Sequence, residues 1–332
     1  PNANTIRGLN GGWSYSWQGN NVEKFSEQYN TILEAMTNKF GSDNIIFEHG
    51  VAYEEHKEWT AEDASGIEKA VAQAKDVDYI IACVGENSYA ETTGNISDLN
   101  LSSNQKLLVK RLQETGKPVI LILNEGRPRL IHDLVDGCKA IVNIMLPGNY
   151  GGDALADLLS GDENFSGRLP FTYPSHPNSF TTYDFKVCEA RETMPGTYNY
   201  EAHTNTQWWF GEGMSYTTFE YSDLQVVQKS ARCFEVSFKV KNTGKYDGAE
   251  VIQVYVRKVD DTEGPIKSLR AFRRVPLKAG ETCVVSIDLL PTTFEFFDPT
   301  TNTMRIMPGK YEIMYGNSSD IPSGNKLSVT LR

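Results

Sequence analysis

Three continuous apolar segments in the first half of the chain constrain its fold more than any other feature. They have the length and β-branched content of strands: VDYIIACV (77–84), PVILIL (118–123) and KAIVNIML (139–146). The segments around them repeat apolar residues at helical intervals. We expect helices at 24–40, 60–76, 103–115, 128–136 and 152–160. Apolar strands that alternate with helices predict a mostly parallel sheet covered on both faces, an α/β sandwich.

Two shorter segments are additional strand candidates for this first domain. They are residues 44–47 and RLPFTY (168–173). In the helix expected at 60–76, Thr60 is the candidate N-cap and Asp63 stands at the spacing of a capping box. These features extend the alternating pattern to both sides of the three apolar strands.

From about residue 216 the pattern changes to short strands of alternating apolar residues, separated by turns rich in Gly, Pro, Asn and Asp. About seven such strands are typical of an immunoglobulin-like or fibronectin-like sandwich. We therefore expect an α/β domain at 1–185, a connecting loop at 186–215 and an all-β domain at 216–332. The clearest strands of the second domain are 234–240, 250–256, 283–289, 311–315 and 326–331.

Charge and composition exclude several classes of function. The chain has 32 Lys and Arg against 43 Asp and Glu, a net charge of −11, whereas nucleic acids and anionic membranes attract basic surfaces. No apolar run approaches the roughly 20 residues of a membrane-spanning helix. Phosphate-binding loops, nucleophile elbows and metal-binding His or Cys spacings are absent. We expect no cofactor, no metal, and neither nucleic acid nor membrane as a partner.

The cysteines and the first residues say little about the compartment. There are five cysteines, Cys83, Cys138, Cys188, Cys233 and Cys283, without a C-x-x-C pair, and their redox state stays open. The start, PNANTIRGLNGG, has no initiator Met and no signal-peptide pattern. We expect a mature chain or a piece of a longer one.

The loop 85–101, GENSYAETTGNISDLNL, directly follows the expected strand at 77–84. Ligands of α/β folds bind beyond the carboxyl ends of parallel strands, which is where this loop begins. It carries Glu86 and Glu91, and carboxylates on such a loop can transfer protons to or from a substrate. The same residues are compatible with an ordinary surface loop, and both interpretations stay open at this point.

The segment 8–19, GLNGGWSYSWQG, places Trp13 and Trp17 among glycines and amides. Aromatic faces outside a helical pattern can stack on sugar rings, and Gln18 and Asn10 could bond sugar hydroxyls. Tryptophans that bury a domain junction would give the same pattern. A binding role and a packing role are therefore both open.

Together these segments resemble glycoside hydrolase family 3. The resembling stretches, in the order of that family, are GGWSYSWQG (11–19), GENSYAETTGN (85–95), LPGNYGGDALADLLSGDENFSGRLPFTYP (146–174), FGEGMSYTTFEYSDL (210–224) and PIKSLRAFRRVPLKAGE (265–281). The resemblance implies a mostly parallel six-stranded α/β sandwich, followed by a fibronectin type III-like domain. It fits the β-glucosidase and exo-glucanase type, whose first domain is a (β/α)8 barrel with the catalytic Asp nucleophile. This sequence resembles only the part after that barrel.

The resemblance also implies roles for individual residues. Glu91 in the A-E-T-T-G stretch would be the general acid/base, whereas Glu86 is the weaker candidate and is expected to orient the loop. Trp17 of W-Q-G is similar to an aromatic wall of the aglycone subsite. The candidate substrate-binding residues are Trp17, Trp13, Tyr89 and Thr92.

The resulting hypothesis is that the chain is the C-terminal part of a retaining β-glycosidase, a β-glucosidase by resemblance, and is inactive in isolation. Its expected partners are a β-glucoside or oligosaccharide and the N-terminal barrel of the same polypeptide. The resemblance implies a periplasmic or secreted location. The alternative is a stand-alone carbohydrate-binding or scaffold module that uses Trp13 and Trp17. For residues 216–332 we expect a stabilising role without a ligand.

Overall fold

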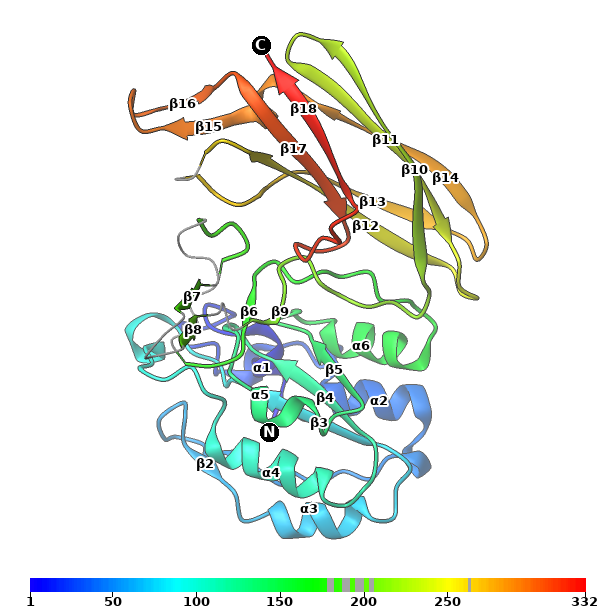
Figure 1. The fold of residues 1–332 in the computed structure, drawn as a ribbon. Coiled ribbons are helices and arrows are strands. Elements are labelled where there is room, and N and C mark those ends of the chain that lie inside the picture. Colours follow the sequence, from blue (N-terminus) through cyan, green and yellow to red (C-terminus); the bar gives the residue numbers. More distant parts are fainter. Residues whose placement is uncertain (178–181, 187–191, 195–199, 203–205, 262–263) are drawn as a thin grey trace. The chain divides into compact units, whose positions relative to one another are not determined.

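The computed structural model describes residues 1–177, 182–186, 192–194, 200–202, 206–261 and 264–332. They form two compact units, Pro1–Glu163 and Asn164–Arg332, each traced by its own colours in Figure 1. The boundaries that we expect at 185 and 215 stay predictions. Much of the connecting loop expected at 186–215, including Cys188, lies outside the described residues.

The first unit is built on a parallel sheet of three strands in the order β3-β4-β5. These are β3 (Ile80–Gly85), β4 (Val119–Asn124) and β5 (Ala140–Asn143), the three apolar segments of the sequence. The register places Gly85 beside Asn124, so the chain leaves β3 and β4 at the same edge. This edge positions the loop 85–101.

The six-stranded sheet that the resemblance implies is not what the described residues show. Residues 45–47 follow the 3₁₀ turn η2 (Ser42–Asn44) and are not in a strand. Of the strand expected at 168–173, only Tyr173 belongs to a strand, the two-residue β6 (Tyr173–Pro174), which is antiparallel to β9 (Thr206–Trp208). The apolar residues were correctly identified, but a strand also needs a neighbour for its backbone groups, which local pattern does not reveal.

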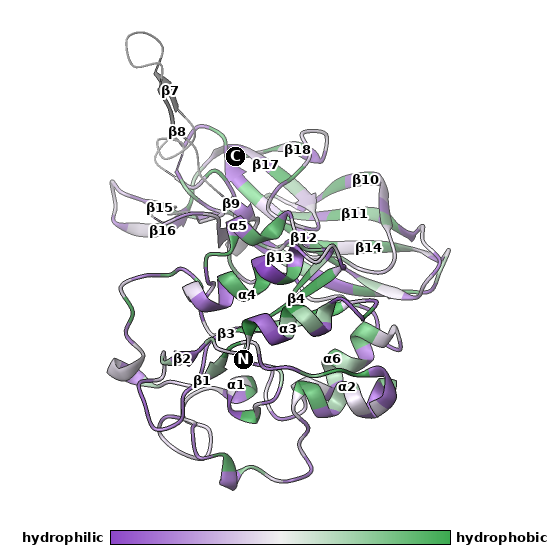
Figure 2. Ribbon diagram, turned by 90° about the horizontal axis from the view of Figure 1, so that it is seen from below, coloured by the Kyte–Doolittle hydropathy of each residue, from purple (hydrophilic) through white to green (hydrophobic). Residues whose placement is uncertain are grey.

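Helices cover both faces of the sheet, as the alternating pattern predicts (Figure 1). On one face, α2 (Ile32–Phe40) and α6 (Gly151–Ser160) bury a core that includes Ile32 and Leu155 together with Cys83 of β3 and Ile122 of β4. On the other face lie α3 (Ile67–Ala74) and α4 (Ser103–Gln113). Figure 2 shows hydrophobic residues along β4 and mixed polarity along α3 and α4.

Three helix starts differ from the sequence-based expectation, and one of them is that of the helix expected at 128–136, which begins only at His132 as α5 (His132–Val135). The helix expected from residue 24 begins only at Ile32, because Thr31 and Glu34 form a capping box there. The helix expected from Thr60 begins at Ile67, and Asp63 belongs instead to β2 (Glu62–Asp63), which pairs with β1 (Ala52–Tyr53). The prediction of Thr60 as the N-cap is therefore wrong, because the residues expected to form the first turn of that helix include strand β2.

The remaining short elements of the first unit join these layers. The short elements are α1 (Ile6–Asn10), η1 (Val22–Lys24), η3 (Glu91–Gly94) and α5 (His132–Val135).

None of the described helices is both long and apolar enough to pass through a membrane.

The second unit contains two antiparallel sheets, with orders β10-β11-β14 and β13-β12-β17-β18. All five strands that the alternating pattern predicts are present. On β11, alternate residues such as Phe234, Val236 and Phe238 enter the core, where they meet β12 and β17 residues. The strands are β10 (Phe219–Ser230), β11 (Cys233–Asn242), β12 (Gly248–Lys258), β13 (Ser268–Leu277), β14 (Thr282–Leu289), β17 (Gly309–Gly316) and β18 (Lys326–Leu331).

Smaller elements complete the second unit. A hairpin of β15 and β16 is paired in a sheet of its own, as are β7 and β8. These elements are η5 (Pro291–Phe294), β15 (Glu295–Asp298), β16 (Thr303–Ile306), β7 (Glu192–Met194) and β8 (Tyr200–Ala202).

Candidate active site

The loop 85–101 begins where β3 and β4 end side by side. The backbone N–H of Glu86 donates to the carbonyl of Asn124 at 2.9 Å. Gly85 has a φ of 142°, and a Cβ there would come within 1.9 Å of the Asn124 carbonyl oxygen. Only glycine permits this approach, so the chain turns out of β3 directly against the end of β4. Residues 125–129, which follow β4, therefore lie next to Glu86.

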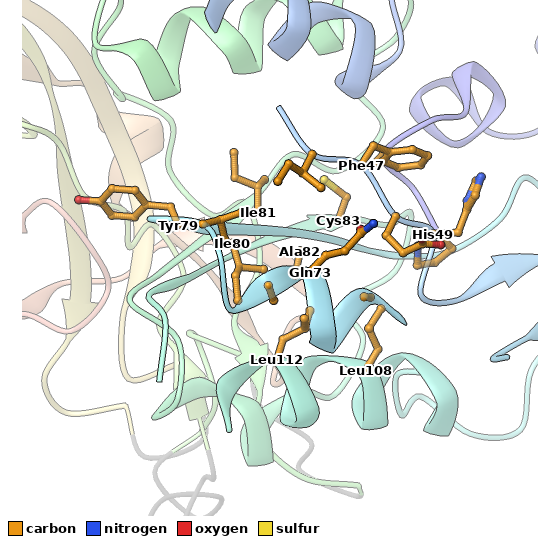
Figure 3. Close-up of a pocket in the computed structure, with 17 residues that line it drawn as sticks. Phe47, His49, Gln73, Tyr79, Ile80, Ile81, Ala82, Cys83, Leu108 and Leu112 are labelled. Atoms are coloured by element: carbon orange, nitrogen blue, oxygen red, sulfur yellow. The ribbon is translucent and has the colours of Figure 1, made fainter. Parts of the chain in front are cut away.

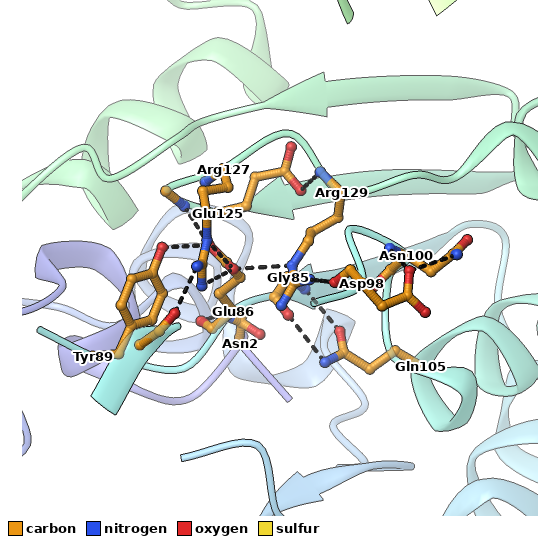
Figure 4. A network of polar contacts seen from close by, with 12 residues as sticks. Asn2, Gly85, Glu86, Tyr89, Asp98, Asn100, Gln105, Glu125, Arg127 and Arg129 are labelled. Carbon is orange, nitrogen blue, oxygen red and sulfur yellow. Dashed lines mark hydrogen bonds and ion pairs between the residues drawn. The ribbon is translucent and has the colours of Figure 1, made fainter. Parts of the chain in front are cut away.

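Glu86 is buried, and its carboxylate accepts five hydrogen bonds and forms an ion pair with Arg129 (Figure 4). One oxygen, Oε1, accepts hydrogen bonds from Nε and Nη2 of Arg127 at 3.0 and 2.8 Å and forms an ion pair with Nε of Arg129 at 2.9 Å. The other, Oε2, receives the Tyr89 hydroxyl at 3.0 Å and the backbone N–H groups of Gly126 and Arg127 at 3.0 and 3.2 Å. Both oxygens of this carboxylate are thus engaged by protein groups, and the side chain is only 1% exposed, so a substrate cannot reach it.

The downstream side of the loop is held by a stack of three side chains. The guanidinium of Arg127 lies 4.1 Å from the ring centre of Tyr89 and 5.6 Å from that of Trp59. Arg127 Nη1 also donates to the Gly94 carbonyl at 2.7 Å, and Trp59 Nε1 donates to the Thr93 carbonyl at 2.7 Å. Burial, together with the charge of Glu86, raises the pKa of Tyr89 to about 12, so its hydroxyl stays a donor at neutral pH.

Glu91 has the opposite environment. It is exposed, it starts the 3₁₀ turn η3, and its φ of 54° is unusual for a residue other than glycine. Across the described part of the chain, its carboxylate forms no ion pair or hydrogen bond. Thr92, the next residue, is exposed as well.

Trp13 and Trp17 are exposed to 69% and 49%. The backbone N–H of Trp13 donates to the Trp17 carbonyl at 2.8 Å, which closes the turn between them. At the end of the turn, a Cβ on Gly19 would come within 1.9 Å of the Gly11 carbonyl oxygen, so the segment requires glycine there. The turn thus leaves two indole faces accessible.

The two segments meet through Gln18. Its Oε1 accepts the Ala90 N–H at 2.9 Å, and its Nε2 donates to the Ala90 carbonyl at 3.2 Å. Asn10 donates to the carbonyl of Ile6 at 3.1 Å. Both amides that we considered for sugar hydroxyls therefore bond backbone groups instead.

The sequence-based reasoning missed Arg127, Arg129 and Trp59. A signal for the arginines was present, because a glutamate directly follows one parallel strand and N-E-G-R-P-R follows the next. Carboxyl ends of adjacent parallel strands share an edge, so opposite charges there are expected to pair.

Two cavities lie in the first unit. One, of about 340 Å³, is lined by polar residues that include Glu62, Glu86 and Gln105, but not by Glu91. Its lining groups bond one another: Gln105 Nε2 donates to Glu62 at 2.7 Å, and Ser102 donates to the same carboxylate. Within the described residues, no group of three or more His, Cys, Asp or Glu could hold a metal ion.

The other cavity, of about 140 Å³, is largely apolar and lies against β3, α3 and α4 (Figure 3). Burial raises the pKa of the Cys83 thiol, which lines it, to about 12. The thiol is therefore a packed neutral group at physiological pH.

Comparison with known proteins places this geometry in a family. Residues 1–216 match the glycosyl hydrolase family 3 C-terminal domain, and residues 250–319 match the fibronectin type III-like domain. The chain is 33% identical to a lysosomal beta glucosidase of Dictyostelium discoideum, over 96% of the chain and 39% of that protein. It is 35% identical to a xylan 1,4-beta-xylosidase of Xylanibacter ruminicola, over 80% of the chain and 31% of that protein.

A similar solved structure is that of a β-glucosidase from Listeria innocua. It has a TM-score of 0.73 and 28% identity, over 83% of this chain and 39% of that one. The chain thus covers 31% and 39% of the two curated relatives, about a third of their length.

Proposed function

The chain belongs to glycosyl hydrolase family 3, and we propose that it is the C-terminal part of a retaining β-glycosidase that removes terminal β-glucosyl residues. In this proposal Glu91 is the general acid/base. The observation that carries it is the contrast between the two glutamates of loop 85–101. Glu86 is saturated by donors, whereas the Glu91 carboxylate is exposed and unengaged. Of the two carboxylates, only that of Glu91 is accessible to a substrate.

A retaining mechanism needs a second carboxylate about 5–5.5 Å from the first, to attack the anomeric carbon. We propose that an N-terminal (β/α)8 barrel of the same polypeptide supplies it. Glu91 protonates the leaving oxygen in the first step, and the nucleophile becomes an uncharged ester. In the second step the Glu91 carboxylate takes a proton from the water that attacks the ester. In this scheme the charge of the nucleophile is present before the first step and is lost once the ester forms, so one carboxyl group can serve as acid first and as base second.

The other candidate residues have roles that follow from their exposure. Trp17 is the proposed wall of the aglycone subsite, and Trp13 and Thr92 are accessible for further contacts. The hydroxyl of Tyr89 already donates to Glu86, so a contact of Tyr89 with substrate would use its ring. Glu86 orients the loop from inside.

The test is Glu91→Ala in the full-length product of the gene that carries this chain. We expect the turnover of an aryl β-glucoside to fall by about 10²–10⁴-fold. Azide should restore turnover and yield the β-glucosyl azide, because it attacks the glycosyl-enzyme without base assistance. The matched control is Glu27→Ala, an exposed glutamate of the same unit, which should keep full activity. An azide-insensitive Glu91→Ala enzyme would contradict the assignment.

The 332-residue chain alone should hydrolyse no glycoside, since it lacks the proposed nucleophile. The alternative function, a stand-alone carbohydrate-binding module, is favoured by the exposure of Trp13 and Trp17. Calorimetric titration of the isolated chain with cellobiose separates the two. Tight binding that is lost in Trp17→Ala supports the module, whereas no binding supports the split active site.

Substrate and location are also proposals. One relative carries the name of a beta glucosidase and another that of a xylosidase, and we propose a β-glucoside or oligosaccharide as the substrate. We propose a periplasmic or secreted location, in line with the lysosomal designation of one relative. For the all-β region from residue 216 we propose a stabilising role, so its deletion should reduce yield and leave loop 85–101 unchanged.

A further inference from the structure

We infer that Gln18 is a positioning residue that fixes the peptide preceding Glu91 and links it to the turn that carries Trp17. The inference rests on the proposed function, because it assigns how the acid/base is held. Gln18 itself touches neither the reacting atoms nor the nucleophile. Its effect passes through the backbone of Ala90.

The geometry of the contact is that of a two-point clamp. One primary amide satisfies both backbone groups of Ala90, at 2.9 Å for the N–H and 3.2 Å for the carbonyl. The clamped carbonyl belongs to the peptide bond that enters Glu91. Ala90 is only 5% exposed, so water does not readily replace either bond. The orientation of this peptide plane therefore depends on the Gln18 side chain.

A second, independent contact brings the same two segments together. A Cβ on Gly12 would come within 2.1 Å of the Tyr89 carbonyl oxygen. The backbone of the aromatic turn thus lies directly against residues 89–90. Gln18 directly follows Trp17, whose carbonyl accepts the Trp13 N–H, so the clamp and the aromatic turn belong to one short segment.

The conformation of Glu91 explains why a clamp is needed. Its φ of 54° is a left-handed conformation, which an L-residue adopts at a cost unless its surroundings impose it. Downstream, Trp59 and Arg127 hold the carbonyls of Thr93 and Gly94. Upstream, Gln18 holds Ala90. Loss of the upstream contact allows Glu91 to relax and moves its carboxyl away from the leaving oxygen.

The experiment uses Gln18→Met in the full-length enzyme, because methionine keeps the length of the side chain and removes both hydrogen bonds. A displaced acid matters most for leaving groups that need a proton. We expect kcat/KM for methyl β-glucoside to fall by about 10–100-fold, as a displacement near 1 Å does. For 2,4-dinitrophenyl β-glucoside, which leaves without a proton, the fall should stay below about threefold. Gln28→Met, at an exposed glutamine, is the control and should change neither value.

A second measurement covers the case in which the variant is poorly active for other reasons. In the 332-residue chain, amide hydrogen exchange at Ala90 should accelerate at least about tenfold in Gln18→Met, while exchange at Leu121 of β4 stays unchanged. Equal losses for the two glucosides, or unchanged Ala90 exchange, would overturn the inference. Glu91→Ala is measured alongside it. If Glu91→Ala lacks the leaving-group dependence, the proposed function fails. If only Gln18→Met lacks it, the clamp alone fails.

Discussion

Two glutamates on one loop, five positions apart, have opposite environments. Glu86 lies at the end of β3, where the strand edge and two arginines surround its carboxylate. Glu91 lies beyond the buried Ala90, with its side chain exposed and its backbone held on both sides. The first carboxylate is fixed by its side-chain partners. At the second position it is the backbone that is fixed, and the side chain is left available for chemistry.

The comparison shows how a fold can use one residue type for two purposes. A buried carboxylate with several charged and backbone donors organises the residues around it, but cannot change its protonation state without disrupting them. An exposed carboxylate can change protonation freely, but organises nothing. In this loop the first provides the order on which the position of the second depends.

The largest expected effect is on stability and comes from Glu86. In the 332-residue chain, Glu86→Gln keeps the shape of the side chain but removes the negative charge that pairs with Arg127 and Arg129. Removing one partner of a buried ion pair costs about 3–5 kcal/mol. We expect this decrease in the free energy of unfolding in urea. For Glu91→Gln we expect a change within about 0.5 kcal/mol, as for surface substitutions. Similar losses for the two variants would remove the distinction between the sites.

A smaller effect is expected where the aromatic turn touches the loop. Gly12→Ala places a Cβ against the Tyr89 carbonyl, a backbone atom that cannot rotate away. We expect a loss of about 1–3 kcal/mol, as for overpacked positions, together with faster amide exchange at Ala90. Gly167→Ala is the control, since it has open space around it and should be neutral or slightly stabilising. An unaffected Gly12→Ala would mean that the two segments separate without cost.

The sequence predicts the strands that position the two glutamates, but not the contacts that make the environments of the two glutamates different. The apolar segments identified β3, β4 and β5 because local pattern decides where buried strands form. Arg127, which donates to Glu86, lies 41 positions further along the chain, and Gln18, which bonds Ala90, lies 72 positions before it. Such contacts depend on side-chain packing and rotamers, which the local periodicity of the sequence does not reveal. The count of six sheet strands came from the family resemblance, and the described residues show three parallel strands.

The third prediction tests whether the backbone decides stability at position 91. Glu91→Val introduces a β-branched residue at a φ of 54°, which should cost about 1–2 kcal/mol. Glu91→Gly relieves the strain but makes the unfolded chain more flexible, so the two effects should cancel within about 0.5 kcal/mol. Urea unfolding of both variants measures this. If valine is tolerated as well as glycine, the left-handed conformation is not enforced.

The smallest expected effect concerns the pH dependence of the link between Tyr89 and Glu86. Burial and the Glu86 charge raise the pKa of Tyr89 to about 12 from an ordinary value of 10. A folded-state pKa above the unfolded one contributes stability that is complete below pH 10 and is lost as the pH rises towards 12. Between pH 9 and 11, wild type should therefore lose more stability than Tyr89→Phe. We expect a difference below about 1 kcal/mol, because the ring is only partly buried. Urea midpoints of the two proteins at both pH values measure it, and the shared contributions of other tyrosines cancel. Equal losses of stability in wild type and Tyr89→Phe would show that the Glu86 carboxylate does not affect the titration of the Tyr89 hydroxyl. The environments of Glu86 and Glu91 would then differ less than their contacts indicate.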